Sequence, residues 1–177
     1  SDSEEYKNYL KSIKKPLVLI GNSMFDLPFI GIDNTKAMYD LTTTIIQRSN
    51  KDTMLYYSPV IGEKLNTTNA QNLRLNGFIS ACTYHGKQYK ITTSLNEINP
   101  SYPIICSTDY YALKVLAHLN NPSDITIAGF DNTSLLRIIN TPIVTVETNT
   151  NIVAQHCINY ILGKKYITQI EHQIIDY

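Results

Sequence analysis

Short, uninterrupted runs of apolar and β-branched residues recur along this chain, and segments with helical spacing separate them. These runs include residues 17–20, 104–106, 125–130 and 143–146. Strands buried on both faces have this continuous apolar composition, whereas strands with one wet face alternate polar and apolar residues. Strands that alternate with helices at this spacing are typical of βαβ units. The sequence therefore predicts an α/β fold built on a mainly parallel sheet.

The remaining expected elements follow the same alternation. We expect helices over residues 3–13, 33–47, 69–84, 109–119 and 149–162. We expect strands over residues 16–20, 29–32, 53–57, 88–91, 103–107, 125–130, 143–146 and 174–175. Asp33 is placed to cap the second helix, because its carboxylate can accept the free amide protons of the first turn. Gly86 and Gly163 follow the ends of two other helices, where glycine is common.

Composition excludes several classes of protein. The chain has 177 residues, of which 43% are hydrophobic, enough to bury a core in one domain or in two small lobes. Its 15 basic and 15 acidic residues balance, which argues against nucleic-acid binding by this chain itself. No apolar run approaches the roughly 20 residues of a membrane span, and we find no secretory signal segment at the start.

Metal, redox and catalytic motifs are not found in the sequence. Cys82, Cys106 and Cys157 are far apart and form no CxxC pair, which fits a reducing cytoplasm better than an extracellular compartment. The four histidines have no spacing that suits a shared metal site. We find no nucleophile elbow, phosphate-binding glycine loop or HExxH motif. We therefore expect a protein that is not an enzyme and needs no metal or cofactor.

Polar residues stand where several of the expected strands end. Asp109, Asp131 and Asn132 all follow apolar runs. In open α/β sheets, ligands bind beyond the carboxyl ends of the strands. Asp109 could cap the following helix or accept hydrogen bonds from a ligand, and both roles can hold at once. Turn chemistry explains Asp131 and Asn132 adequately, so we interpret them as framework.

Arg74 and two tyrosine pairs have both a functional and a structural interpretation. The guanidinium of Arg74 could hold two hydroxyls or a carboxylate in a cleft, or it could be a solvated surface group. Tyr56-Tyr57 and Tyr110-Tyr111 could stack on a sugar ring, although half-buried scaffold tyrosines are the commoner explanation.

Four motifs in order resemble a known family. They are "NLRLNGF" (72–78), "PIICSTDYYALKVL" (103–116), "SDITIAGFDN" (123–132) and "TPIVTVE" (141–147). Together they look like the effector-binding domain of bacterial transcription repressors of the LacI/GalR family. "KPLVLIGN" and "FIGIDNTKAMYDL" resemble the family as well, so the likeness runs from about residue 15 to the end.

The resemblance implies a periplasmic-binding-protein-like fold with two parallel-sheet lobes. The first lobe, incomplete in this chain, is expected to be residues 1–32 plus 147–169, and the second residues 33–146 plus 170–177. The family's helix-turn-helix DNA-binding domain is absent from the sequence given. The region between Gly86 and Pro103 is shorter than in the family, which usually has a full helix there. Three crossovers are expected near residues 30–33, 146–148 and 170–173.

The resemblance also assigns ligand-binding residues. Arg74 and Asp109 fall on the family's ligand-binding Arg and Asp. Thr68 and Thr148 fall where relatives offer small polar contacts, although ordinary loop and hinge roles suit them equally. The family further implies a two-fold dimer through the C-terminal lobe, to which an apolar face of the helix after Asp109 would contribute. That face consists of Ala112, Val115 and Leu116, for which core packing is the alternative.

These expectations combine into one hypothesis and two alternatives. A small sugar, such as ribose or another mono- or disaccharide, binds between the lobes of a cytoplasmic repressor and changes its affinity for operator DNA. A purine or a sugar phosphate would also suit a cleft with an Arg and an Asp. A secreted sugar-binding protein of a transporter shares the fold and is the first alternative. A small α/β enzyme is the second, although it needs a nucleophile or phosphate loop that we do not find.

Overall fold

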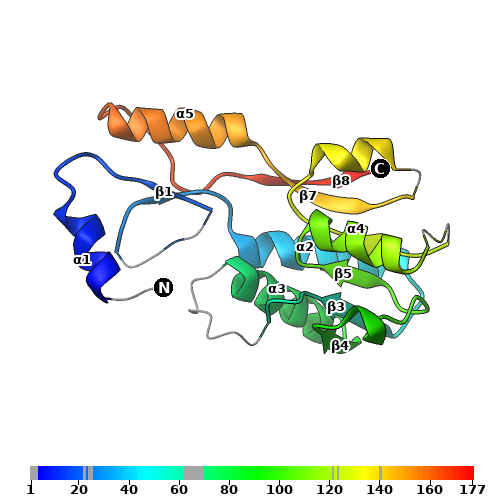
Figure 1. Cartoon of the computed structure of the whole chain (residues 1–177). Helices are drawn as coiled ribbons and strands as arrows, with labels where there is room; N and C mark the ends of the chain where they lie inside the picture. Colours follow the sequence, from blue (N-terminus) through cyan, green and yellow to red (C-terminus); the bar gives the residue numbers. More distant parts are fainter. Residues whose placement is uncertain are drawn as a thin grey trace.

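The computed structural model contains two separate β-sheets (Figure 1). It describes residues 4–21, 23, 26–61, 70–120, 122, 124–139 and 141–177. The larger sheet has six strands and the smaller has two. None of the helices in these residues is long and apolar enough to cross a membrane.

The large sheet is parallel except at one edge. Its spatial order is β4-β3-β5-β6-β7-β8, and only β8 runs antiparallel, against β7. The strands are β3 (Thr53–Tyr57), β4 (Gln88–Thr92), β5 (Ile104–Cys106), β6 (Ile127–Ala128), β7 (Val144–Thr148) and β8 (His172–Asp176). The predicted α/β class with a mainly parallel sheet is therefore confirmed.

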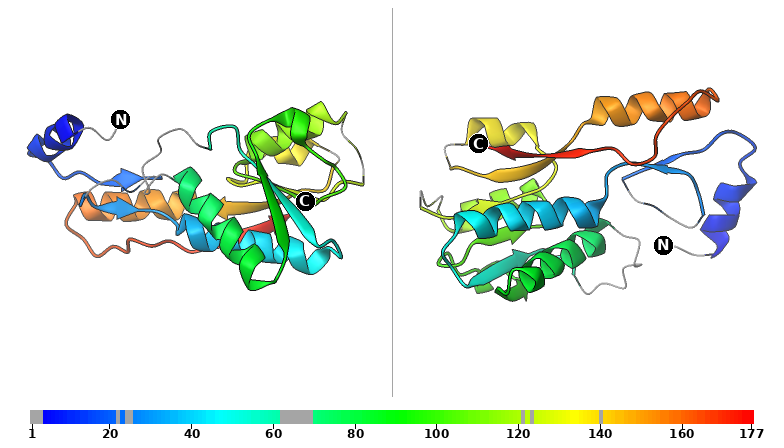
Figure 2. Two further views of the ribbon diagram at one scale, coloured as in Figure 1. Left: turned by 90° about the horizontal axis from the view of Figure 1, so that it is seen from below. Right: turned by 180° about the vertical axis from the view of Figure 1, so that it is seen from behind.

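Helices cover both faces of the large sheet, and its strands bury side chains toward each of them. Successive side chains of a strand point to opposite faces. Accordingly, Met54 and Tyr56 of β3 belong to one core cluster, whereas Leu55 and Tyr57 belong to another. The first cluster packs under α2 (Asn34–Arg48) and α3 (Ala70–Tyr84), and the second under α4 (Asp109–His118). Figure 2 shows α2 and α3 side by side on their face of the sheet.

A glycine permits the close contact between α2 and α3. A Cβ atom at Gly77 would lie 2.2 Å from the carbonyl oxygen of Thr35 and 3.0 Å from the backbone nitrogen of Tyr39. No real side chain fits at such distances from backbone atoms. The glycine of the "NGF" motif is therefore required by helix packing, which in turn fixes where the neighbouring turns of α3 lie.

The second core cluster corrects one sequence-based expectation. Ala112, Val115 and Leu116 of α4 are at most 1% exposed and belong to this cluster. The expectation that they form a dimer face is wrong, because helix α4 uses that face to cover the sheet. The core-packing alternative describes them correctly.

The small sheet lies away from these layers, on the left of Figure 1, with two helices near it. It pairs β1 (Leu19–Ile20) with β2 (Phe29–Ile30) in parallel. The helices are α1 (Glu4–Ser12) and α5 (Thr150–Ile161). The predicted residue boundaries of two lobes stay a prediction.

Neighbouring connections between the two groups of elements are hydrogen-bonded to each other. One follows β2 and enters α2, and another precedes β8. The Gly31 amide donates to the Thr168 carbonyl oxygen at 3.0 Å, and the Ile170 amide donates to the Gly31 carbonyl oxygen at 2.8 Å. A third connection leads from β7 into α5, which Asn149 caps by accepting from the Ile152 amide.

The observed elements differ from the expected ones mainly at strand ends. The expected strand at 125–130 is reduced to Ile127–Ala128. Residues 144–148 of β7 pair in antiparallel register with residues 172–176, so the tail forms a five-residue strand where a strand of two residues was expected. His172 and Gln173 are polar and hid this strand, because an edge strand need not be continuously apolar. Between β4 and β5 the chain forms only the single turn η1 (Leu95–Glu97), and a second short helix, η2 (Ser134–Ile138), follows β6.

Candidate functional site

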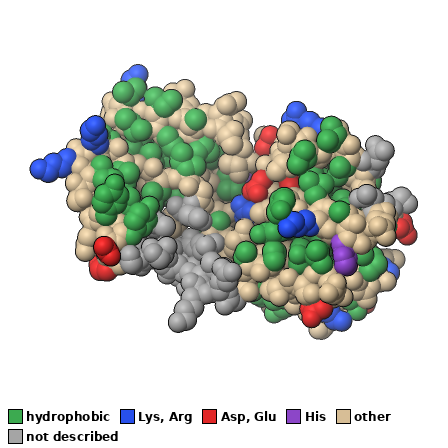
Figure 3. Space-filling view, viewed as in Figure 1, with side chains coloured by type: hydrophobic (Ala, Val, Ile, Leu, Met, Phe, Trp, Pro, Cys, Tyr) green, Lys and Arg blue, Asp and Glu red, His purple; other side chains and the backbone are tan. Residues whose placement is uncertain are grey.

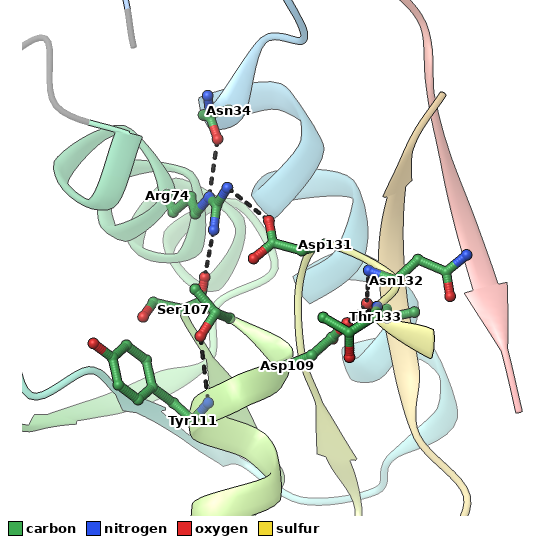
Figure 4. A network of polar contacts seen from close by, with 10 residues as sticks. Asn34, Arg74, Ser107, Asp109, Tyr111, Asp131, Asn132 and Thr133 are labelled. Atoms are coloured by element: carbon green, nitrogen blue, oxygen red, sulfur yellow. Dashed lines mark hydrogen bonds and ion pairs between the residues drawn. The ribbon is translucent and has the colours of Figure 1, made fainter. Parts of the chain in front are cut away.

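Arg74 is held by contacts from three different elements of the large-sheet layers. Its side chain, in α3, is 11% exposed. Its Nε donates to Oδ1 of Asn34 at 2.9 Å, and its Nη1 donates to the carbonyl oxygen of Ser107 at 2.7 Å. Its Nη2 donates to Oδ1 of Asp131 at 3.1 Å. The guanidinium carbon also lies 3.6 Å from the centre of the Phe130 ring, a cation–π geometry. Figure 4 shows Arg74 reaching toward these polar partners.

The fold explains why these groups meet. Asn34 begins α2, Ser107 follows β5, and Asp131 follows β6. Because β5 and β6 are parallel neighbours, their carboxyl ends lie at the same edge of the sheet. Burial lowers the pKa of Arg74, and the nearby carboxylate of Asp131 opposes that shift. Arginine stays charged in either case. The solvated-surface interpretation of Arg74 is therefore wrong.

Asp131 belongs to this site, although the sequence suggested only framework for it. Its carboxylate pairs with Arg74 and stays 43% exposed. Burial raises the pKa of Asp131, and the Arg74 guanidinium lowers it. Its backbone has a φ of 108°, an uncommon conformation for any residue but glycine. Such strain concentrates at functional sites. The signal in the sequence was a carboxylate directly after a buried strand, and turn chemistry explained it too readily.

Asn132 does match the framework interpretation. Its backbone also lies in the left-handed region, with a φ of 49°. Its amide nitrogen Nδ2 donates to Oε1 of Glu147 at 3.0 Å, and its Oδ1 accepts from the hydroxyl of Tyr177 at 2.8 Å. These bonds attach the turn after β6 to β7 and to the end of the chain.

Asp109 is enclosed by the protein. It is fully buried. Its Oδ1 accepts from the hydroxyl of Thr145 at 2.6 Å, and its Oδ2 accepts from the Thr133 amide at 2.7 Å. Burial raises the pKa of Asp109, and these hydrogen bonds counteract the shift. Because both carboxylate oxygens bond inside the protein, the geometry favours a structural role over direct ligand contact.

Two neighbours define the position of Asp109. Thr108, and not Asp109, is the N-cap of α4, since its hydroxyl accepts from the Tyr111 amide at 3.3 Å. A Cβ atom at Gly129 would lie 2.3 Å from Oδ1 of Asp109, so only glycine leaves room for this carboxylate. The glycine of the "GFDN" motif, Gly129, thus packs directly against Asp109 of the "TD" pair.

The two threonines are not brought to Arg74 by any described contact. Thr148 is half-buried at the end of β7 and pairs with His172 of β8. Among the described residues, no hydrogen bond joins it to Arg74 or Asp109. Thr68 lies outside the described residues. Ligand contact by either threonine stays a prediction.

The tyrosine pairs divide between core and surface. Tyr56 is fully buried, and its ring centre lies 5.0 Å from that of Phe78. Burial raises the pKa of its hydroxyl. Tyr57 is also buried, so this pair is scaffold. Tyr110 is exposed and tilts against Tyr111 on the outer side of α4.

A cavity of about 270 Å³ lies where the chain passes between the two sheets, and we call it the crossover cavity. Asn34 links it to Arg74, because Asn34 lines the cavity and accepts from the guanidinium. Figure 3 shows the surface hollowed between the two groups of elements, with acidic and basic side chains on the large-sheet side. The residues that line the crossover cavity are Gly21, Ser23, Phe29, Gly31, Ile32, Asp33, Asn34, Thr35, Leu73, Thr168 and Gln169.

A larger hollow of about 770 Å³ lies at the opposite edge of the large sheet. Residues that precede β3, β5 and β6 line it, including Lys51, Pro103 and Asp124. Ligands of open α/β sheets bind beyond the carboxyl ends of strands, not at their amino ends. The crossover cavity is therefore the better candidate site. In the described residues, no group of three or more His, Cys, Asp or Glu is arranged to hold a metal ion.

Known proteins resemble this chain in sequence and in overall fold. No family model matches the chain. The HTH-type transcriptional regulator RegA of Clostridium saccharobutylicum is 27% identical over 179 residues, which cover 85% of this chain and 52% of the relative. The chain thus spans about half the length of that curated relative.

Several solved structures share the fold. A LacI-family regulator from Corynebacterium glutamicum matches 92% of this chain and 72% of its own, with 17% identity and a TM-score of 0.74. A probable maltose operon repressor from Staphylococcus aureus matches 99% of this chain and 71% of its own, with 20% identity and a TM-score of 0.75. The chain has the fold of the LacI-family transcriptional regulators. The resemblance of its motifs to the LacI/GalR family and the predicted periplasmic-binding-protein-like fold are confirmed.

One structure with this LacI-family fold was solved with a sugar. It is a periplasmic binding protein/LacI transcriptional regulator from Alkaliphilus metalliredigens, complexed with D-xylulofuranose. It is 18% identical, covers 98% of this chain and 82% of its own, and has a TM-score of 0.71.

Proposed function

We propose that this chain is the ligand-sensing part of a sugar-responsive transcriptional repressor. A small sugar, such as ribose or another mono- or disaccharide, binds at the crossover cavity next to Arg74. The observation that carries the proposal is the immobilised guanidinium at the carboxyl edge of the sheet. The sugar complex of a protein with the same fold supports the ligand class.

The geometry of Arg74 suits recognition of hydroxyl groups. Contacts with Asn34, Ser107 and Phe130 fix the guanidinium before any ligand arrives. A donor that is already oriented loses little side-chain entropy on binding, which favours affinity. Among the described contacts, the fork keeps further N–H groups for a ligand, because each Nη carries two.

The crossover cavity is placed to sense relative orientation. We propose that residues 1–32 plus 147–169 form one lobe and residues 33–146 plus 170–177 the other. The cavity takes Phe29 and Thr168 from the first and Asn34 and Leu73 from the second. A sugar that touches both lobes favours one orientation only if it binds that orientation better. In the complete repressor, this bias changes operator binding by a DNA-binding domain in the cytoplasm.

We also propose a homodimer through the second lobe, with a face different from the one that the sequence suggested. Tyr110 of α4 and Leu135 and Ile138 of η2 are more than half exposed. Helices α4 and η2 pack over the same core cluster, and exposed apolar side chains on adjacent elements mark candidate interaction surfaces. These three residues are the proposed contacts.

The first test is a thermal-shift screen of the full-length polypeptide against pentoses, hexoses, disaccharides, sugar phosphates and purines. A ligand present at about 100 times its Kd stabilises the protein by roughly 2.7 kcal/mol. Arg74→Lys keeps the charge but removes the fork, and we expect it to abolish the shift. Arg48→Lys is the matched control. Arg48 forms an ion pair with Asp176, with a distance of 2.6 Å between them, and this pair does not line the crossover cavity. A shift that survives Arg74→Lys, or no shift with any compound, would contradict the proposal.

The second test measures the coupling to DNA. The stabilising sugar should change the affinity of the full-length protein for its operator in a mobility-shift titration. Unchanged affinity together with sugar binding would favour the transporter-type binding protein.

A further inference from the structure

The hollow at the amino ends of the large-sheet strands has no part in the proposed function, and we call it the amino-edge hollow. We propose that it is a second binding site, which takes a zwitterionic short peptide of about three residues. Its volume of about 770 Å³ lies in the range of roughly 300–1,000 Å³ that small-molecule sites usually have. The inference does not depend on the proposed function, because the hollow and the crossover cavity share no lining residue.

The backbone around the amino-edge hollow offers hydrogen-bond acceptors. Two helices end there, since Ser49, the C-cap of α2, and Leu119, the C-cap of α4, both line the hollow. The last turn of a helix has carbonyl oxygens without partners inside the helix, and it carries a partial negative charge. This end of the sheet therefore suits an ammonium group, whereas the helix N-termini at the carboxyl ends of the strands present amide donors.

A lysine of the protein shows that groups at this edge can hold an ammonium. The Nζ atom of Lys87 donates to the carbonyl oxygen of Lys51 at 2.9 Å, and it lies 3.3 Å from Oδ1 of Asp52. A backbone carbonyl and a carboxylate are thus sufficient partners. The amino terminus of a peptide needs the same two kinds of acceptor.

Two side chains of opposite charge line the hollow without an ionic partner. Lys51 and Asp124 are exposed, and among the described residues neither of their charged groups is paired. Arg48, the other charged side chain of the lining, is already paired with Asp176. Unpaired charges of both signs in one hollow complement a ligand that has an ammonium group at one end and a carboxylate at the other.

The order of the strands sets the length of that ligand. Lys51 shortly precedes β3, Asp124 shortly precedes β6, and β5 lies between these two strands. Neighbouring strands are about 4.8 Å apart, so the two approaches are separated by roughly 10 Å. An extended peptide spans about 3.3–3.6 Å per residue, and three residues therefore bridge this gap. A single amino acid is too short to reach both charges.

The lining between the two charges is apolar. Pro103 and Ile125 are buried, and Pro122 and Leu119 are half-buried. The fixed φ of proline keeps its backbone in place before a ligand arrives. These residues offer apolar contacts to the side chains of a bound peptide.

The test is isothermal titration calorimetry of the full-length protein with trialanine as the probe, at about pH 7, where both its termini are charged. N-acetyl-trialanine lacks the ammonium group, and trialanine amide lacks the carboxylate. Free alanine keeps both charges but is short. We expect trialanine to bind, and each of the other three compounds to bind at least about tenfold more weakly, the effect of one lost charged contact.

Two variants assign the ends of the peptide. Asp124→Asn should weaken trialanine binding by about tenfold and remove its advantage over the N-acetyl form. Lys51→Gln should do the same for the advantage over the amide. Asp52→Asn is the matched control, because it removes a carboxylate from the same edge that does not line the hollow and should leave the affinity unchanged.

Several results would overturn the inference. Trialanine that does not bind, or that binds no better than its blocked forms, would exclude a zwitterion site. A folded Asp124→Asn variant with unchanged affinity would exclude the assigned ammonium contact. Binding that is lost in Arg74→Lys would place the peptide at the crossover cavity instead. Each result leaves the sugar screen unaffected, so the failure of this inference and that of the proposed function are distinguishable.

Discussion

The large sheet carries one Arg–Asp ion pair near the amino ends of its parallel strands and another near their carboxyl ends. The two pairs have different surroundings. Arg48 and Asp176 lie 2.6 Å apart, with side chains that are 46% and 55% exposed. Arg74 and Asp131 lie farther apart, at 3.1 Å, but Arg74 is only 11% exposed. Asn34, Ser107 and Phe130 also contact Arg74. The shorter contact therefore belongs to the more exposed pair.

The comparison shows that surroundings, and not distance, decide what an ion pair contributes. Water and salt screen an exposed pair, which typically contributes between 0 and about 1 kcal/mol. Arg74 is largely shielded from water, so losing it or one of its partners is more costly than at the exposed pair. The Arg74 site is therefore a rigid part of the fold as well as a candidate binding site.

The largest expected effect comes from deleting the buried cation. Arg74→Met keeps length and apolar volume but leaves Asp131 and Asn34 without their donor. We expect a loss of about 3 kcal/mol in the free energy of unfolding. Arg48→Met should cost less than about 1 kcal/mol. Urea denaturation of both variants measures the difference, and equal losses would end the distinction between the two pairs.

A smaller loss should follow from crowding the buried site. Gly129→Ala places a Cβ atom 2.3 Å from Oδ1 of Asp109, so the strand end or α4 must shift. Overpacking of this kind costs about 1–3 kcal/mol. Gly86→Asn is the control, because no atom lies within 4 Å of a Cβ there and asparagine tolerates its positive φ. Thermal unfolding of both variants tests this, and a Gly129→Ala protein as stable as Gly86→Asn would refute the packing argument.

A third expected difference is the dependence of stability on pH. Burial raises the pKa of Asp131 above its ordinary value. The folded state then binds protons more readily than the unfolded state. The contribution of Asp131 is therefore greatest below the unfolded pKa and is lost as pH rises through the folded pKa.

Comparing wild type with Asp131→Asn isolates this dependence. As pH rises from the unfolded to the folded pKa of Asp131, the unfolding free energy of the wild type should fall more steeply than that of Asp131→Asn. Arg74→Met should enlarge the effect, because the guanidinium lowers the pKa of Asp131. The corresponding difference for Asp176→Asn gives the reference. A wild-type slope no steeper than that of Asp131→Asn would contradict the expectation.

The smallest effect concerns salt. A double-mutant cycle on Arg48 and Asp176 should give a coupling of at most about 0.5 kcal/mol in dilute buffer, and it should vanish in 1 M NaCl, where the Debye length is about 3 Å. The coupling between Arg74 and Asp131 should survive the same salt, because Arg74 is shielded from solvent. Equal sensitivity to salt would remove the distinction between them.

The sequence predicted the fold better than the site. The strands can be predicted from neighbouring residues, whereas the site depends on contacts between residues that are far apart in the sequence. Continuous apolar runs such as 104–106 report burial directly, so the parallel sheet could be read from neighbouring residues. The strand at 172–176 could not, because its polar residues interrupt the apolar pattern and its pairing depends on β7. Arg74 was found through its motif. Its pairing with Asp131, 57 residues away, is set by the crossing of α3 over two strand ends and left no local trace.

Asp109 illustrates the opposite case. Its position after a buried strand suggested a group that faces a cleft, and local spacing is indeed compatible with that. What turns it inward is the missing side chain of Gly129, just after β6, and the hydroxyl of Thr145 on β7. Residues that are distant in sequence therefore decide whether a carboxylate at a strand end meets a ligand or the protein interior.

The hydrogen bonds between Gly31 and the segment 168–170 have a mechanical consequence. Two connections that were free of each other could bend and twist separately, and the elements on either side could then move in many directions. The bonds from the Gly31 amide and to its carbonyl join the two connections into one ribbon. A ribbon flexes readily across its flat face and resists bending within its plane. Motion between the small and large sheets is thereby confined to few directions.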